Sequence, residues 1–173
     1  LERNFRHRLL NRLNELVSQI IALSRLQSQD PLLAAEEVDL DAVVTASVDR
    51  CRPLAESRQV TITIAGEPGL LTWGDASQLE TAVTNLVQNA IVYSQEGARV
   101  AVLTRGVHGE DDRVELAVSD NGIGIAEEHL PRLFERFFRV DYGRSRASGG
   151  TGLGLSLVKH IVEAHGGTVQ VWS

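Results

Sequence analysis

The chain has 173 residues, 43% of them hydrophobic, which is enough for one compact domain with an appendage but not for two large independent domains. Its net charge of -6 and pI near 5.4, without any long basic run, argue against a protein that binds nucleic acid by neutralising the phosphates. One cysteine, Cys51, excludes an internal disulfide and indicates a core residue, and no apolar stretch reaches the roughly 20 residues of a membrane-spanning helix.

The first predicted element is a helix with a heptad pattern of apolar residues. The apolar positions follow at alternating steps of four and three: Leu9, Leu13, Leu16, Ile20 and Leu23. Such a helix cannot bury its apolar face alone, so we expect it to pair with a hairpin partner, another subunit, or both. Asp30-Pro31 ends the helix region at 1–30, a linker is expected at 31–40, and a domain at 41–173.

Helices and strands alternate in the rest of the chain. Asp41 is a good N-cap for a helix whose last turns Pro53 should kink or loosen, and Asp75 is expected to cap a long helix through Ala90. The spacing predicts strands at 60–64 and 70–73, an antiparallel strand pair at 100–104 and 114–119, a mobile loop at 139–150, a helix at 151–164 and a strand at 168–172. This order predicts an α/β two-layer sandwich.

Two asparagines, Asn85 and Asn89, are four residues apart and therefore lie on one face of the same helix. An amide oxygen is a hard neutral ligand that suits Mg²⁺ when nucleotide phosphates supply the charge. Taken alone, the pair is equally typical of a solvated helix face.

A second motif, Asp120-Asn-Gly122-Ile-Gly124, follows a predicted strand. The Asp120 carboxylate could accept a hydrogen bond from the exocyclic amino group of adenine, which guanine lacks at that position. The alternative is a simple Asx-Gly turn, and this motif alone favours neither interpretation.

The glycine run from Gly149 to Gly154 opens the last predicted helix, where bare backbone N-H groups could bind phosphate; the alternative is a flexible hinge. Between the two glycine motifs lies a cluster of phenylalanines and arginines. By themselves these residues indicate core packing and solvated charge: Phe134, Phe137, Phe138, Arg139, Arg144 and Arg146.

The order of the four motifs resembles the N, first glycine, F and second glycine boxes of sensor histidine kinases, and Leu23-Ser-Arg-Leu26 resembles the end of the second helix of their dimerisation hairpin. The resemblance implies a Bergerat-type fold with a mixed sheet covered by helices, and ATP and Mg²⁺ as cofactors. It also implies a hairpin homodimer, a response regulator as partner, and a cytoplasmic fragment of a membrane-anchored parent. The run Phe137 to Asp141 and Trp73-Gly-Asp75 resemble phosphate-responsive kinases of actinobacteria.

The resemblance also implies roles for individual residues. Asn89 binds Mg²⁺ with Asn85 supporting the phosphate end, Asp120 reads adenine, and Tyr93 borders the nucleotide. The loop between Gly124 and Gly150 is the ATP lid, which the phenylalanines hold. The remaining ATP-binding residues would be Gly122, Gly124, Ile125, Phe134, Phe138, Arg139, Arg144, Arg146, Thr151, Gly152, Leu153 and Gly154.

The chain departs from the family pattern at three places. Val92 stands where many relatives carry a lysine or arginine, His7 lacks the neighbours of a phosphoacceptor histidine, and the chain ends at Ser173, where relatives continue into one more strand. We therefore expect this fragment to bind ATP without phosphorylating itself.

Three other functions share parts of the pattern. An ATP-hydrolysing clamp of the gyrase and mismatch-repair kind needs a glutamate where Asn85 stands, because the glutamate activates water. An anti-sigma-factor serine kinase lacks the heptad helix. A degenerate module that binds a nucleotide only to regulate would be compatible with Val92.

Overall fold

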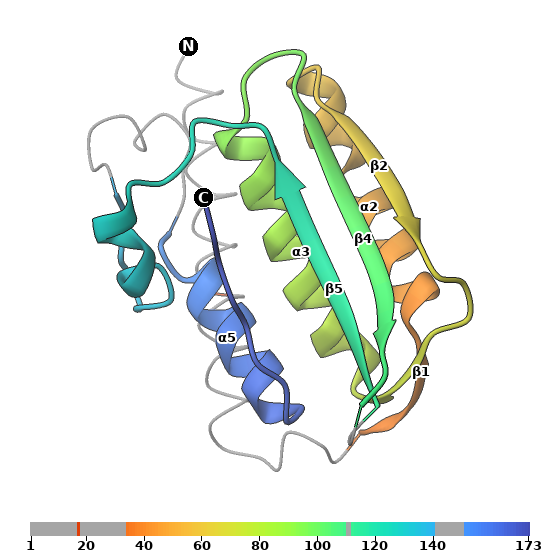
Figure 1. Cartoon of the computed structure of the whole chain (residues 1–173). Coiled ribbons are helices and arrows are strands. Elements are labelled where there is room, and N and C mark those ends of the chain that lie inside the picture. The colour runs from red at the N-terminus through yellow and green to blue at the C-terminus, as the bar shows by residue number, and fades with distance from the viewer. Residues whose placement is uncertain (1–16, 18–33, 110–111, 141–150) are drawn as a thin grey trace.

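The computed structural model describes Val17 and residues 34–109, 112–140 and 151–173. Apart from Val17, the predicted heptad helix lies outside the described residues, as do His7, Arg144 and Arg146. Figure 1 shows the elements in chain order. They are β1 (Glu36–Asp39), α2 (Leu40–Ser57), β2 (Thr61–Gly66), β3 (Leu71–Gly74), α3 (Ala76–Tyr93), β4 (Arg99–Val107), β5 (Arg113–Asp120), the 3-10 helix η1 (Glu127–Arg132) and α5 (Gly154–Ala164).

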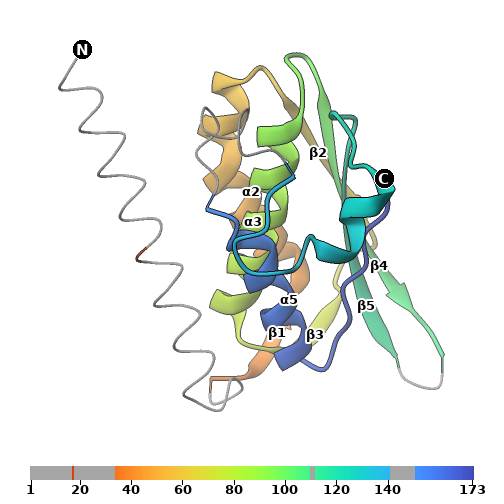
Figure 2. The same cartoon turned by 90° about the vertical axis from the view of Figure 1, so that its left-hand side faces the viewer.

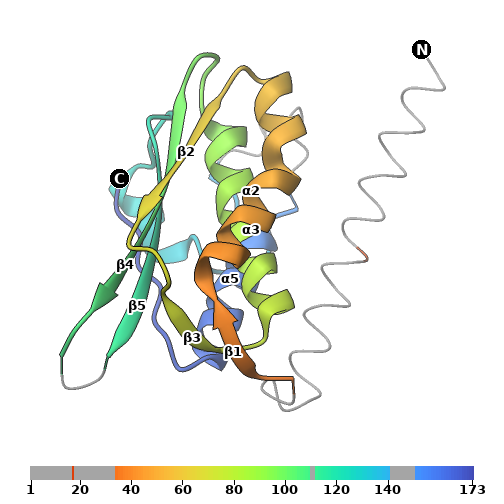
Figure 3. The same cartoon turned by 90° about the vertical axis from the view of Figure 1, so that its right-hand side faces the viewer.

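The main sheet is mixed and has the order β2-β4-β5. Strand β2 runs parallel to β4, with Ile62 opposite Val100, and β5 runs antiparallel to β4, with Val118 opposite Val102. A separate antiparallel ribbon pairs β1 with β3. Helices α2, α3 and α5 all lie on one face of the main sheet (Figures 2 and 3). The predicted two-layer α/β sandwich and the antiparallel pair are thereby confirmed.

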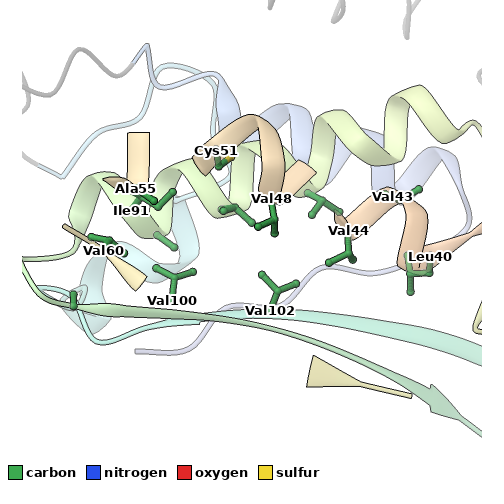
Figure 4. Close-up of a cluster of buried hydrophobic side chains, with 14 of the residues drawn as sticks. Leu40, Val43, Val44, Val48, Cys51, Ala55, Val60, Ile91, Val100 and Val102 are labelled. Atoms are coloured by element: carbon green, nitrogen blue, oxygen red, sulfur yellow. The ribbon is translucent and has the colours of Figure 1, made fainter. Parts of the chain in front are cut away.

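The core lies between this sheet face and the helices, because alternate residues of each strand point to the same side. Val100 and Val102 of β4 are fully buried and face apolar side chains of α2 and α3 (Figure 4). Cys51 belongs to this cluster, and burial raises the pKa of its thiol to about 11. Cys51 is therefore a core residue, as the sequence indicates.

The predicted N-cap of α2 was wrong, and the structure adds detail at the predicted linker and at Pro53. The N-cap of α2 is Asp39, whose Oδ1 accepts from the N-H of Asp41 at 2.9 Å, while the Asp41 carboxylate accepts from the N-H of Gly69 at 3.0 Å. The predicted linker contains strand β1, which pairing with β3 stabilises although only Val38 of its residues is buried. Helix α2 continues through the exposed Pro53 to Ser57, because Cys51 and Ala55 on its opposite face remain packed in the core.

The predicted last strand, 168–172, is also wrong, because no strand is assigned there. The segment is extended and lies beside α5 and β5 (Figures 1 and 2). Val169 packs against the second apolar cluster, formed by Ala82 of α3 with Leu157, Val158 and Ile161 of α5. Within the described residues, no helix combines the length and hydropathy needed to cross a bilayer.

His165 connects the C-terminal end of α5 to the N-terminal end of α3. Its Nε2 accepts from the N-H of Asp75 at 3.0 Å, and its Nδ1 donates to the carbonyl of Ile161 at 2.8 Å. The two bonds together require the neutral ring with its proton on Nδ1. Asp75 caps α3 through Ser77 and Gln78, as predicted, so His165 orients the residue that begins the helix.

We expect His165→Ala to lower the free energy of unfolding by about 1–2 kcal/mol, because it leaves the N-H of Asp75 without its acceptor in a partly buried position. Urea unfolding followed by circular dichroism measures the change. His108→Ala is the matched control, since His108 is exposed in the β4–β5 turn, where it pairs with the equally exposed Asp112. Equal stabilities of the two variants would contradict this role of His165.

Candidate functional site

The first part of the site is the meeting of α3 with the start of α5. The Asn85 Nδ2 donates to the carbonyl of Thr81 at 2.8 Å, which turns Oδ1 toward α5. A Cβ placed on Gly154 would lie 2.7 Å from that Oδ1, so a larger residue there would have to displace the Asn85 amide. Asn89 lies one turn further along α3 and is half-buried. The two predicted boxes, asparagine and second glycine, are therefore adjacent.

The N-terminus of α5 is open to an anion. Its N-cap, Leu153, provides no capping side chain, and the Thr151 hydroxyl accepts from the N-H of Leu153 at 3.2 Å just before the helix. The first backbone N-H groups of a helix have no intrahelical acceptor, and the helix dipole favours negative charge there. This terminus faces the Asn85 amide and has the chemistry of a phosphate site.

The second part is the loop that follows β5. Asp120 Oδ1 accepts from the N-H of Gly122 at 2.8 Å, an Asx turn that does not engage Oδ2. The N-H of Ile123 donates to the carbonyl of Tyr93 at 3.3 Å, and a Cβ on Gly122 would lie 2.6 Å from that carbonyl oxygen. Asn121 Oδ1 accepts from the N-H of Arg99 at 2.9 Å. The loop is thus attached both to the end of α3 and to the start of β4.

The third part joins the phenylalanine box to the second glycine box. The N-H of Phe137 donates to the carbonyl of Gly152 at 2.8 Å, and the two backbones approach so closely that a Cβ on Gly152 would lie 2.8 Å from Phe137 Cα. Phe138 packs under the Arg132 guanidinium, 4.4 Å from the ring centroid. Phe134 faces a hollow lined by η1 and the C-terminal segment.

Several predicted site residues differ in their exposure and surroundings. Gly124 adopts a positive φ of 69°, but the neighbouring N-H of Ile125 donates to the hydroxyl of Ser173 at 2.8 Å. Arg139 is half-buried, and Phe137 is 59% exposed. The lid arginines at 144 and 146 lie outside the described residues.

Sequence reasoning missed Arg58 and the pairing of Glu80. The Arg58 NH1 donates to the carbonyl of Val92 at 3.0 Å, at the end of α3. Glu80, the only acidic residue of α3, forms an ion pair with Arg50 of α2 at 2.8 Å. The one signal for Arg58 in the sequence is its position, a cation directly after the apolar pattern of α2. Nothing in the sequence indicates that its partner is Val92, 34 residues away.

The amides of α3 are compatible with Mg²⁺ only as minor ligands. In the described part of the chain, no group of three His, Cys, Asp or Glu side chains could hold a metal ion. The Asn85 Oδ1 faces the glycine backbone of α5, which leaves a neutral oxygen beside the N-terminus of that helix. Magnesium commonly takes few protein ligands and is held largely by phosphate oxygens, so this donor set fits a metal that arrives with a nucleotide.

The contact between Gly152 and Phe137 gives a testable difference between two glycines. Gly152 has φ 74° and Gly69 has φ 73°, but a Cβ on Gly69 would meet no atom within 4 Å. Alanine at either position pays the left-handed backbone cost of roughly 1–2 kcal/mol, and only Gly152→Ala adds a clash with backbone. We expect Gly152→Ala to lose at least about 1 kcal/mol more stability than Gly69→Ala in urea unfolding. Equal losses would show that the Phe137 backbone moves away freely.

Comparisons with known proteins bear on these residues. Residues 74–173 match the family described as histidine kinase-, DNA gyrase B-, and HSP90-like ATPase. The sensor-like histidine kinase SenX3 of Mycolicibacterium smegmatis is 45% identical over 163 residues, which are 94% of this chain and 42% of that protein. The phosphate regulon sensor protein PhoR of Pseudomonas aeruginosa is 32% identical over 162 residues, which are 94% of this chain and 36% of that protein.

Among solved structures, a mycobacterial sensor histidine kinase, MprB, superposes with a TM-score of 0.62 and 34% identity, covering 76% of this chain and 80% of that one. The chain spans less than half the length of the curated relatives SenX3 and PhoR. The name of PhoR, a phosphate regulon sensor protein, agrees with the phosphate-responsive subgroup that the sequence resembles. The chain therefore belongs to the histidine kinase-, DNA gyrase B- and HSP90-like ATPase family, as an ATP-binding catalytic domain of the sensor histidine kinase type.

Proposed function

We propose that this domain holds Mg²⁺-ATP and presents its γ-phosphoryl group to a histidine of a dimerisation hairpin, from which the group passes to an aspartate of a response regulator. The observation that carries the proposal is the position of Asn85, whose amide oxygen faces the open N-terminus of α5. Around it, α3 also holds the Asp120 loop at its C-terminal end. One helix thus connects a base-binding carboxylate to a phosphate-binding helix end.

Asp120 and its neighbours bind the adenine. Oδ1 maintains the turn through Gly122, and Oδ2 accepts from the exocyclic amino group of the base. A guanine would present a carbonyl oxygen to this carboxylate and be rejected. Gly122 and Gly124 let the base approach, while Tyr93, which is 41% exposed, borders it together with Ile125.

The start of α5 and the asparagines bind the phosphates. The backbone around Thr151, Gly152, Leu153 and Gly154 donates to the phosphate oxygens, and Asn89 supplies an amide oxygen to Mg²⁺ while Asn85 supports the phosphate end. Mg²⁺ held there would supply positive charge beside the phosphate oxygens. In the transfer, a histidine nitrogen forms a bond to the γ-phosphorus. At the same time the bond between the γ-phosphorus and the β–γ bridging oxygen breaks, and that oxygen leaves with ADP. The ATP lid contains the remaining predicted residues, namely Phe134, Phe138, Arg139, Arg144 and Arg146.

The partners follow from this reaction. A homodimeric hairpin supplies the histidine, a response regulator accepts the phosphoryl group, and the parent protein is anchored in the bacterial membrane. The net charge of -6 speaks against nucleic acid as a partner. The likeness to PhoR supports phosphate availability as the stimulus of the parent.

Hydrolysis by the same fold is disfavoured by the position of the α3 carboxylate. A clamp ATPase needs a general base one turn before the magnesium asparagine, and this position is Asn85, an amide that cannot accept a proton. Glu80 cannot replace it, because it is paired with Arg50 on the α2 side of the helix. A regulatory module that binds ATP without transfer is the second candidate, favoured by the uncharged Val92.

Titration of the chain with ATP by calorimetry, with and without Mg²⁺, tests the site. We expect magnesium-dependent binding that Asp120→Ala weakens roughly ten- to a hundredfold, the worth of one hydrogen bond to a charged group. Asp120→Asn keeps an oxygen that can accept from the N-H of Gly122. This variant therefore removes the negative charge and leaves the turn in place. Asp112→Ala, an exposed carboxylate in the β4–β5 turn, should bind like wild type. A folded wild-type chain that produces no binding heat and shows no competition by ADP would refute the nucleotide site.

Transfer is tested by mixing the chain with a separately produced dimerisation hairpin that carries a phosphoacceptor histidine, and with γ-labelled ATP. We expect label on the hairpin histidine, reduced at least roughly tenfold by Asn89→Ala because charge on the phosphates is then less well neutralised. Glu80→Gln should transfer normally. Binding without transfer would identify a regulatory module, and release of free phosphate that Glu80→Gln abolishes would identify an ATP-hydrolysing clamp.

A further inference from the structure

Three consecutive carbonyls at the end of α3 accept hydrogen bonds from three different parts of the molecule. The Ile91 carbonyl accepts from the N-H of Ser94 at 3.4 Å, the Val92 carbonyl from Arg58 NH1 at 3.0 Å, and the Tyr93 carbonyl from the N-H of Ile123 at 3.3 Å. The last four carbonyls of a helix have no intrahelical donor, so these bonds determine how the helix end is held.

Arg58 provides the charged bond of the three. It directly follows α2, and its own N-H donates to the carbonyls of Leu54 and Ala55 at 3.2 and 3.1 Å, so its backbone is fixed. Helix α3 has no basic residue in its last turn. A cation at a helix C-terminus is favoured by the helix dipole, and α3 receives this cation from α2.

The bond from Arg58 lies next to the attachment point of the adenine-binding loop. Val92 immediately precedes Tyr93, whose carbonyl accepts from Ile123, and Ile123 follows the Asp120 turn. If the last turn of α3 frays, the Tyr93 carbonyl turns away and the Asp120 carboxylate loses its fixed position. Asn89, one turn earlier, is less affected.

We infer that Arg58 is a positioning residue for nucleotide recognition: by holding the Val92 carbonyl, it fixes the end of α3 on which the Asp120 loop rests, and thereby sets the preference for adenine. This inference rests on the proposed function for the ligand, but the position of the loop can be measured without a nucleotide.

The test compares Arg58→Ala and Arg58→Lys with Arg52→Ala in the full chain. Arg52 lies on α2, is exposed and pairs with Asp49 at 2.7 Å, so it controls for loss of a surface arginine. In the nucleotide-free protein, we expect Arg58→Ala to shift the amide resonances of Gly122 and Ile123 and to speed hydrogen exchange at Ile123. Arg58→Lys, which retains charge and a donor, should keep most of the protection, and Arg52→Ala all of it.

Calorimetry with Mg²⁺-ATP and Mg²⁺-GTP completes the test. We expect Arg58→Ala to weaken ATP binding about tenfold, the worth of a charge-assisted hydrogen bond, and GTP binding much less, so that the preference for adenine falls. Unchanged Ile123 exchange, or equal losses for both nucleotides, would overturn the inference. A different outcome is that the wild-type chain binds no ATP while Arg58→Ala still speeds hydrogen exchange at Ile123. That result would refute the proposed function and would support the positioning role of Arg58.

Discussion

The packing of α3 between α2 and α5 is the interaction on which the rest of the structure depends. One side of α3 buries Val83, Val87 and Ile91 in the main core, and another side places Ala82 against α5. A helix held on both sides cannot rotate, so its remaining face points in a fixed direction. Asn85 and Asn89 continue the α5-facing side, one and two turns beyond Ala82, and the Asp120 loop is attached to the helix end.

The chemistry at this face follows from the choice of an amide over a carboxylate. Asn85 contacts the carbonyl of Thr81 and the start of α5, positions in which a carboxylate would repel both the carbonyl and an incoming phosphate. A neutral amide tolerates both neighbours and leaves no base to activate water. The carboxylate that α3 does contain serves as a link to α2 through Arg50. The helix therefore keeps its one carboxylate away from the face that carries Asn85 and Asn89, as the proposed phosphoryl transfer requires.

The glycines act by permitting close approach and not by making the chain loose. Gly154 brings backbone against the Asn85 amide, Gly122 brings it against the Tyr93 carbonyl, and Gly152 brings it against Phe137. Each contact joins two of the four motifs. The motifs are far apart in sequence, and the missing Cβ atoms allow them to form one surface.

The sequence by itself determined those features that arise within one element. The four-residue spacing of Asn85 and Asn89, the cap at Asp75 and the alternation in β4 are local patterns, and they sufficed for the fold class and the family. The tertiary structure decided which of two aspartates caps α2, since pairing of β1 with β3 extends the backbone at Asp39. It also decided that Arg58 would bind Val92 and that His165 would bind Asp75, across 34 and 90 residues. No local pattern encodes such bonds, because their geometry exists only after helices and sheet have packed.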